Sequence, residues 1–264
     1  MLLNKNIIIT GGAGLLGKEH ALAVMEEGAN AFLLDTNRKE LLKFVKHTNK
    51  YKKFKGKCFA KICDVTSEAQ VKKFLNFLKK NNYKPDVLIN NVASNPASIK
   101  KDFTTLDKFT VKQWQRDLDI NLTSSFICSK IIGQEMAKNK KGNIINISSD
   151  LGLIAPDQRI YNKSRKYLST KPVSYSVTKH AIIGLTKYLA TYWADHGVRS
   201  NCLVPGGVEN NQNKYFIKKV KKLIPLGRMA QKNEYKGAIK FLCSEASSYM
   251  NGANLVIDGG RTIW

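Results

Sequence analysis

The sequence predicts an α/β protein in which a doubly wound parallel sheet of about seven strands carries helices on both faces. Three observations predict this fold. Short apolar runs alternate with amphipathic helical patterns, a glycine-rich turn follows the first run, and no Pro/Ser-rich linker or internal repeat divides the chain. At 264 residues the chain can bury one substantial core, so we expect a single domain over residues 1–264.

The apolar runs give the strands of this sheet. In chain order they are Asn6–Thr10, Ala31–Asp35, Lys57–Asp64, Asp86–Asn90, Gly142–Ser149, Val198–Val204 and Ala253–Ile257. Apolar residues recur at helical spacing between them, which predicts helices over Leu15–Glu27, Ser67–Asn81, Val111–Ala137, Val173–Ala194 and Lys232–Cys243.

Two stretches do not fit this alternation. Residues 153–172 separate a strand from a helix that could be joined directly, and we interpret them as an insertion on the substrate side. Residues 206–226 combine an Asn-rich sequence with a short basic helix, which predicts a mobile cover over a site.

Composition limits the class of protein. No apolar run is long enough to span a membrane, so we expect a soluble cytoplasmic protein. The five cysteines are scattered and the four histidines show no ligand spacing, which predicts reduced thiols and no metal site. The net charge of +24 and pI near 9.8 would attract nucleic acids. Because the lysines are spread through the chain without an arginine-rich, aromatic stripe, we expect no specific nucleic-acid binding.

A glycine turn lies between the first strand and the first helix. The residues Gly11, Gly14, Leu15, Leu16 and Gly17 are in the strand-turn-helix context of a dinucleotide-binding, Rossmann-type fold. Glycines let the backbone approach a pyrophosphate, and the helix N-terminus offers free amide donors. The turn therefore predicts a dinucleotide cofactor.

The second strand indicates which dinucleotide binds. Asp35 lies 18 residues beyond Gly17, where a carboxylate can accept hydrogen bonds from both ribose hydroxyls of NAD and would repel the 2′-phosphate of NADP. Arg38 could accommodate that phosphate, so NADP stays the alternative. Further cofactor contacts are expected at the ends of the third and fourth strands, from Asp64, Val65, Asn91, Val92 and Ala93.

The pattern Tyr-x-x-x-Lys suits alcohol oxidation, because a lysine one helical turn away stabilises a phenolate that takes the hydroxyl proton. It occurs at Tyr51, Tyr167, Tyr175 and Tyr215. Pro172 disfavours helical geometry after the Tyr167 pair, whereas Tyr175 and Lys179 begin a long unbroken helical pattern. We therefore predict that Tyr175 is the acid/base and Lys179 its activator.

Several motifs occur in the order and spacing of one family. They are the glycine turn, Asn90-Asn91, Asp119-Ile120-Asn121-Leu122, the strand that ends at Ser149, Tyr175 with Lys179, Pro205-Gly206 and the terminal Val256-Ile257-Asp258-Gly259-Gly260. With them the chain resembles the short-chain dehydrogenase/reductase family over nearly its full length.

The resemblance implies roles for particular residues. Ser149 hydrogen-bonds the reacting oxygen, Tyr175 transfers the proton, Lys179 also holds the nicotinamide ribose, and Asn121 positions a water. Pro205, Gly206 and Val208 are added to the cofactor site. The chain departs from the family pattern in the spacing of its glycine turn, in Val92-Ala93, and in Asn210, where a threonine is usual.

A narrower resemblance concerns the substrate. Residues 155–161, the helix 185–194 and the ending 258–264 look like the flagellin-modification oxidoreductases of bacterial legionaminic-acid-type sugar synthesis. This implies a carbohydrate substrate. We expect a phosphorylated or nucleotide-linked sugar, because Arg159 in the basic insertion, beside Gln158, has a planar fork that matches phosphate oxygens; the alternative is a solvated basic loop. The other expected substrate-binding residues are Ser149, Asp150 and Tyr175, and we expect a homodimer or homotetramer. The alternatives are an NADPH-dependent ketone or acyl reductase and a non-catalytic, cofactor-binding regulator.

Overall fold

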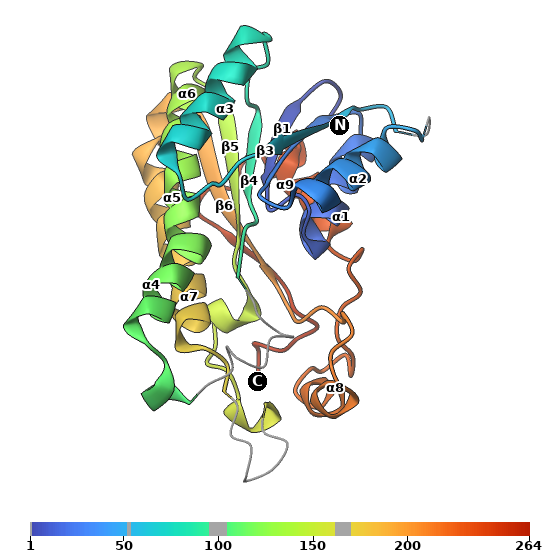
Figure 1. The fold of residues 1–264 in the computed structure, drawn as a ribbon, viewed down its shortest axis with the longest axis vertical. Helices are drawn as coiled ribbons and strands as arrows, with labels where there is room; N and C mark the ends of the chain where they lie inside the picture. Colours follow the sequence, from blue (N-terminus) through green and yellow to red (C-terminus); the bar gives the residue numbers. More distant parts are fainter. Residues whose placement is uncertain (1, 52–53, 95–104, 162–169) are drawn as a thin grey trace.

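The computed structural model describes residues 2–51, 54–94, 105–161 and 170–264. Within them one seven-stranded sheet has the order β3-β2-β1-β4-β5-β6-β7, and every neighbouring pair is parallel. The strands are β1 (Asn6–Thr10), β2 (Asn30–Asp35), β3 (Cys58–Ile62), β4 (Val87–Asn90), β5 (Gly142–Ile147), β6 (Val198–Pro205) and β7 (Asn254–Ile257). The predicted doubly wound parallel sheet is confirmed (Figure 1).

Helices cover both faces of the sheet (Figure 1). One layer contains α1 (Leu15–Glu26), α2 (Arg38–Thr48) and α9 (Lys236–Cys243), whose apolar residues share a core with the sheet. The other contains α3 (Glu68–Lys80), α4 (Val111–Leu118), α5 (Ser124–Cys128), α6 (Gln134–Lys138) and α7 (Val173–Tyr192). Successive strand residues point into opposite cores, as Ile8 does between Ile7 and Ile9, so the strands are apolar without alternation.

The long helix expected over Val111–Ala137 is present but not regular. Two π-helical turns, Asp119–Thr123 and Ser129–Gly133, separate α4, α5 and α6. The first helical layer also contains α2, which was not predicted. Its apolar pattern is short in a lysine-rich stretch, and an Asn37 side chain that accepts the Glu40 amide marks its start.

The two irregular stretches lie near one another. The basic helix expected within 206–226 is present as α8 (Lys214–Lys221). Its Val220 packs in a small apolar cluster with Ile160, from a 3-10 turn at Gln158–Ile160 inside the proposed insertion. Residues 162–169 of that insertion, including Tyr167, lie outside the described residues.

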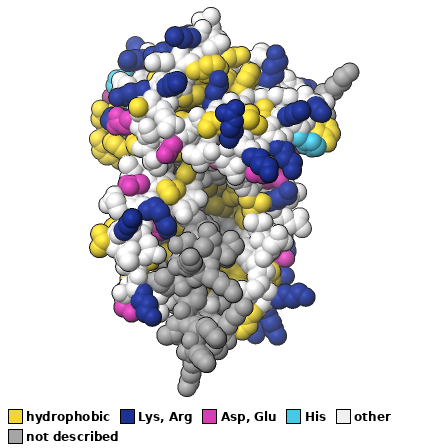
Figure 2. Space-filling view, in the orientation of Figure 1, with side chains coloured by type: hydrophobic (Ala, Val, Ile, Leu, Met, Phe, Trp, Pro, Cys, Tyr) yellow, Lys and Arg dark blue, Asp and Glu magenta, His cyan; other side chains and the backbone are white. Residues whose placement is uncertain are grey.

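Three further predictions concern features beyond the fold. All five cysteines are buried and free, as expected. In the described part of the chain, no helix is long and apolar enough to cross a membrane, and no group of three or more His, Cys, Asp or Glu side chains could hold a metal. On the face in Figure 2, Lys and Arg side chains are scattered rather than gathered into one stripe.

Candidate active site

A cavity of about 2250 Å³ runs along the carboxyl edge of the sheet. It extends from the glycine turn after β1 to the start of α7 and to α8. The predicted residues that line it are Gly11, Gly14, Leu15, Leu16, Asp35, Asp64, Val65, Asn91, Val92, Ala93, Ser149, Asp150, Tyr175, Lys179, Pro205, Gly206 and Val208. The fold thus brings most of the predicted site together.

The glycine turn has the geometry of a phosphate cradle. Gly11 adopts a φ of 66°, which favours glycine, and Gly14 caps α1 without a side chain. Gly17 does not line the cavity. A Cβ at Gly17 would collide with the Gly11 carbonyl, so this residue lets the helix pack closely against the turn. The N-terminus of α1 therefore faces the cavity, as a pyrophosphate requires.

Carboxylates at the ends of β2 and β3 organise the far end of the cavity. Asp35 accepts the Ala13 amide at 2.9 Å and the Asn37 amide at 2.8 Å, which joins the glycine turn to the end of β2. Asp64 accepts the Thr66 amide and hydroxyl at 2.9 and 2.7 Å. Both carboxylates are partly exposed to the cavity, so this end fits an adenosine ribose and adenine.

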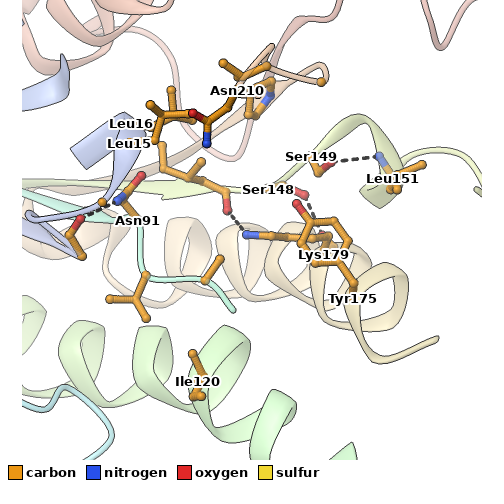
Figure 3. A pocket seen from close by; sticks show the side chains of 18 of the residues that line it. Leu15, Leu16, Asn91, Ile120, Ser148, Ser149, Leu151, Tyr175, Lys179 and Asn210 are labelled. Atoms are coloured by element: carbon orange, nitrogen blue, oxygen red, sulfur yellow. Dashed lines mark hydrogen bonds between the residues drawn. The ribbon is translucent and has the colours of Figure 1, made fainter. Parts of the chain in front are cut away.

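Tyr175 and Lys179 lie one turn apart near the start of α7. Figure 3 shows both side chains projecting toward the end of β5. The Lys179 ammonium donates to the Ile147 carbonyl at 2.8 Å and lies 5.8 Å from the centroid of the Tyr175 ring. Burial raises the pKa of Tyr175 to about 12, which a hydrogen bond with Ser149 opposes. Burial lowers the pKa of Lys179 to about 8.

The two serines after β5 differ in their contacts. Ser148 donates to the Lys179 carbonyl at 2.7 Å, so it holds α7 against the sheet. Ser149 donates to the Asp150 carboxylate at 2.7 Å and bonds Tyr175. This geometry supports Ser149, rather than Ser148, as the serine beside the reacting oxygen.

Asn121 lies in the first π-helical turn and is almost fully buried. Its side chain accepts the Ser94 amide and donates to the Ser94 carbonyl. Asn121 does not line the cavity, and these bonds tie the wide turn to the loop after β4. Its predicted role in positioning a water stays a prediction.

The substrate end differs from the prediction. Gln158 does not line the cavity, and its side chain accepts the Lys171 amide at 2.8 Å. The Arg159 side chain is 87% exposed and is bound to Asp157 through two hydrogen bonds of 2.9 Å. The geometry gives the predicted substrate contact of Arg159 no support, because its guanidinium faces solvent.

Sequence reasoning missed three polar residues that line this end: Tyr161, Lys171 and Arg261. One signal for Lys171 was available, since it precedes Tyr175 by the same four positions by which Lys179 follows it. Tyr161 lies in the predicted substrate-side insertion, two residues beyond Arg159, but it was not chosen as a site residue. Arg261 had no local signal, because it comes to the cavity from the other end of the chain.

The sequence and the fold are similar to those of known proteins. A family model described as enoyl-(acyl carrier protein) reductase matches residues 12–262. The NAD-dependent glycerol dehydrogenase of Listeria innocua is 30% identical over 267 residues, which cover 99% of this chain and 95% of that protein. The chain belongs to the short-chain dehydrogenase/reductase family. It is therefore an NAD(P)-dependent oxidoreductase acting on alcohols or ketones.

Solved structures of the short-chain dehydrogenase/reductase family agree with this assignment. A short-chain dehydrogenase of Leptospira borgpetersenii with bound NAD⁺ is 32% identical and has a TM-score of 0.86, covering 99% of this chain and 94% of that one. A gluconate 5-dehydrogenase of Burkholderia cenocepacia, in complex with NADP and tartrate, is 27% identical with a TM-score of 0.85, covering 100% and 97%. Because both cofactors occur among the relatives, they do not decide between NAD and NADP.

Proposed function

We propose that this short-chain dehydrogenase uses NAD to interconvert a secondary alcohol and a ketone on a sugar that carries an anionic group. The observation that carries the proposal is the grouping of Ser149, Tyr175 and Lys179 at one end of a cavity whose other end holds the glycine turn and Asp35. A proton-transfer group and a dinucleotide cradle thus share one space.

The residues divide the chemistry of alcohol oxidation. The Tyr175 phenol oxygen takes the hydroxyl proton, and the Lys179 ammonium favours the phenolate that does so. Ser149 hydrogen-bonds the reacting oxygen beside Tyr175. NAD, when bound, accepts the hydride from the carbon. In ketone reduction Tyr175 returns the proton.

The choice of NAD rests on Asp35. Its carboxylate lines the cavity at the end of β2, where it would bind ribose hydroxyls and repel a 2′-phosphate. Arg38, the residue that could reverse this preference, is exposed at the start of α2 and does not line the cavity. We therefore propose NAD as the cofactor, with NADP the weaker one.

The substrate class rests on two observations. Relatives of this chain include a glycerol and a gluconate dehydrogenase, which act on polyols and sugar acids. The segments at 155–161, 185–194 and 258–264 add the narrower resemblance to legionaminic-acid-type sugar synthesis. We propose that the enzyme acts in the cytoplasm on a phosphorylated or nucleotide-linked amino sugar of a bacterial surface glycan.

We also propose a homodimer or homotetramer. Phe126 of α5 and Tyr188 and Tyr192 of α7 are between 48% and 61% exposed. Large apolar side chains on neighbouring helices support a protein contact there. Sedimentation of the purified enzyme tests this, and a monomer at micromolar concentration contradicts it.

A second candidate is an NADPH-dependent ketone or acyl reductase, which the 29% identity to a 3-oxoacyl-[acyl-carrier-protein] reductase of Thermotoga maritima favours. One screen separates the two. Formation of NADH is followed with polyols, sugar acids, sugar phosphates and nucleotide-linked amino sugars, and oxidation of NADPH is followed with an acetoacetyl thioester. We expect NADH formation with at least one sugar. If the enzyme oxidises NADPH with the thioester but forms no NADH with any sugar, the second candidate is correct and the first is wrong.

A further inference from the structure

Tyr235 is a fully buried tyrosine that holds a turn of the cofactor site. It directly precedes α9, is 0% exposed, and is the largest fully buried side chain in the described part of the chain. Its hydroxyl donates to the Gly206 carbonyl at 3.0 Å. Burial raises the pKa of Tyr235, so the hydroxyl keeps its proton and stays a donor. The chemistry of alcohol oxidation described above makes no use of this residue.

Gly206 lies on the reacting side of the cavity. It follows β6, and β6 pairs with β5, which ends beside Ser149. Asp35 ends β2 instead, and β1 and β4 separate β2 from β5 in the sheet. Gly206, Asp35 and Tyr175 all line one cavity. A dinucleotide whose adenosine binds at Asp35 and whose reacting ring reaches Tyr175 therefore has its nicotinamide half beside Gly206.

The helix that begins after Tyr235 is fixed to the helix of the glycine turn. Figure 1 shows α9 beside α1, and apolar residues of both belong to the same core cluster as Tyr235. The Lys236 ammonium of α9 lies 3.8 Å from the Glu19 carboxylate and 2.9 Å from the Glu26 carboxylate, both on α1. Tyr235 thus connects the element that offers the pyrophosphate cradle with the turn at Gly206.

Other contacts keep this turn folded without the tyrosine hydroxyl. The Gly206 amide donates to the Ile257 carbonyl at 2.9 Å, and the Ala230 amide donates to the Gly207 carbonyl at 3.0 Å. Loss of the hydroxyl alone should therefore leave the chain folded. It would still remove the proton donor from the carbonyl of a buried hydrogen bond, which is unfavourable, so the turn would shift to find another donor.

We propose that Tyr235 is a positioning residue for the cofactor: its hydroxyl holds the Gly206 turn in the place where the nicotinamide half binds. The proposal rests on the proposed dehydrogenase function and adds to it a residue that does not line the cavity. A residue that acts in this way affects one half of the dinucleotide. Removal of the hydroxyl should weaken binding of the nicotinamide half and leave binding of the adenosine half unchanged.

The test compares a whole dinucleotide with its adenosine half. NADH and ADP are each titrated by calorimetry into the parent enzyme and into Tyr235→Phe, which keeps the ring and removes the hydroxyl. We expect the dissociation constant of NADH to rise by about three- to thirtyfold in the variant. The dissociation constant of ADP should not change, because ADP has no group that reaches the Gly206 turn.

A matched control removes another buried hydroxyl near the same helix. Ser247 lies beyond the other end of α9 and outside the cavity, is 1% exposed, and donates to the Leu242 carbonyl at 2.9 Å. Ser247→Ala should bind both NADH and ADP as the parent does. Urea unfolding should show a loss of stability in both variants, since each loses a buried hydrogen bond. Only Tyr235→Phe should lose affinity for NADH.

The outcomes separate this proposal from the proposed function. Unchanged NADH affinity in Tyr235→Phe overturns the positioning role. Equal weakening of NADH and ADP, or a variant that does not fold, also overturns it, because Tyr235 then supports the whole structure. A parent that binds NADPH better than NADH contradicts the proposed cofactor, and the comparison is then made with NADPH and its 2′-phosphorylated adenosine half. A parent that binds neither dinucleotide contradicts the dehydrogenase function, and the role of Tyr235 with it.

Discussion

The two ends of the cavity are built on different principles. At the cofactor end, Asp35 and Asp64 are partly exposed, and their carboxylates accept hydrogen bonds from backbone amides, in the case of Asp35 also from the glycine turn. At the substrate end, Asp150, Lys171 and Lys179 are buried, and burial shifts the pKa of each. Recognition of a dinucleotide thus depends on the shape of the glycine turn and on one carboxylate, whereas proton transfer depends on ionisable groups that are buried away from water.

This difference predicts where a substitution does most harm. A change at the substrate end alters protonation and should act mainly on turnover. A change at the cofactor end alters the choice between NAD and NADP, and it should act mainly on the ratio of kcat/KM for the two cofactors. The following predictions test that division, beginning with the largest expected effect.

Tyr175→Phe should lower turnover by at least about a hundredfold, because the variant has no group to take the hydroxyl proton. NAD affinity, measured by calorimetry, should change little, since the cofactor end is untouched. Near-normal turnover, together with an inactive Tyr167→Phe variant, would show that the other tyrosine–lysine pair is the catalytic one.

Lys179→Met should lower turnover by about ten- to a hundredfold and also move its pH dependence. The Lys179 ammonium favours the phenolate, so without it the rise of kcat/KM for alcohol oxidation should occur at higher pH. A pH profile of the variant checks this. An unchanged profile with lower turnover throughout would limit Lys179 to holding the cofactor.

Asp35→Ala should narrow the ratio of kcat/KM between NAD and NADP by about tenfold, because the repulsion of the 2′-phosphate disappears. Turnover with saturating NAD should stay close to that of the parent. If the parent enzyme already prefers NADP, Arg38 governs the choice and the proposed cofactor is wrong.

The smallest effect concerns His20, a fully buried residue of α1 behind the glycine turn. Burial lowers its pKa to about 4, below the unfolded value of about 6.5. The unfolded chain therefore binds the extra proton first, so stability is full above pH 6.5 and declines toward pH 4. The slope is at most about 1.4 kcal/mol per pH unit. Urea unfolding of the parent and His20→Met over this range should show a shallower decline in the variant; equal slopes contradict the prediction.

The same division explains what the sequence could predict. The strands are read from apolar runs buried on both faces, and the cofactor turn from glycines at fixed spacing, so both are local signals. Tyr175 and Lys179 are also local, because one helix carries them. The order of the strands in the sheet was not predicted, because apolar runs do not show which strands pair.

The substrate end could not be predicted in the same way. Arg261 reaches Asp150 across more than a hundred residues of sequence, and the segment around Arg159 contains several basic residues that look equivalent. Charge in the sequence did not show that Arg159 turns to solvent with Asp157 while Lys171 turns inward.

The first π-helical turn, at Asp119–Thr123, limits which insertions and deletions this chain can tolerate. A π-helical turn holds one residue more than an α-helical turn. Gln115 and Ile120 face the cavity at its start, whereas Ile127 and Ile131 beyond it belong to the buried core. Deleting one codon here would rotate the following helix by about 100°, because an α-helix has 3.6 residues per turn. A change of length by one residue in this stretch should therefore not be tolerated.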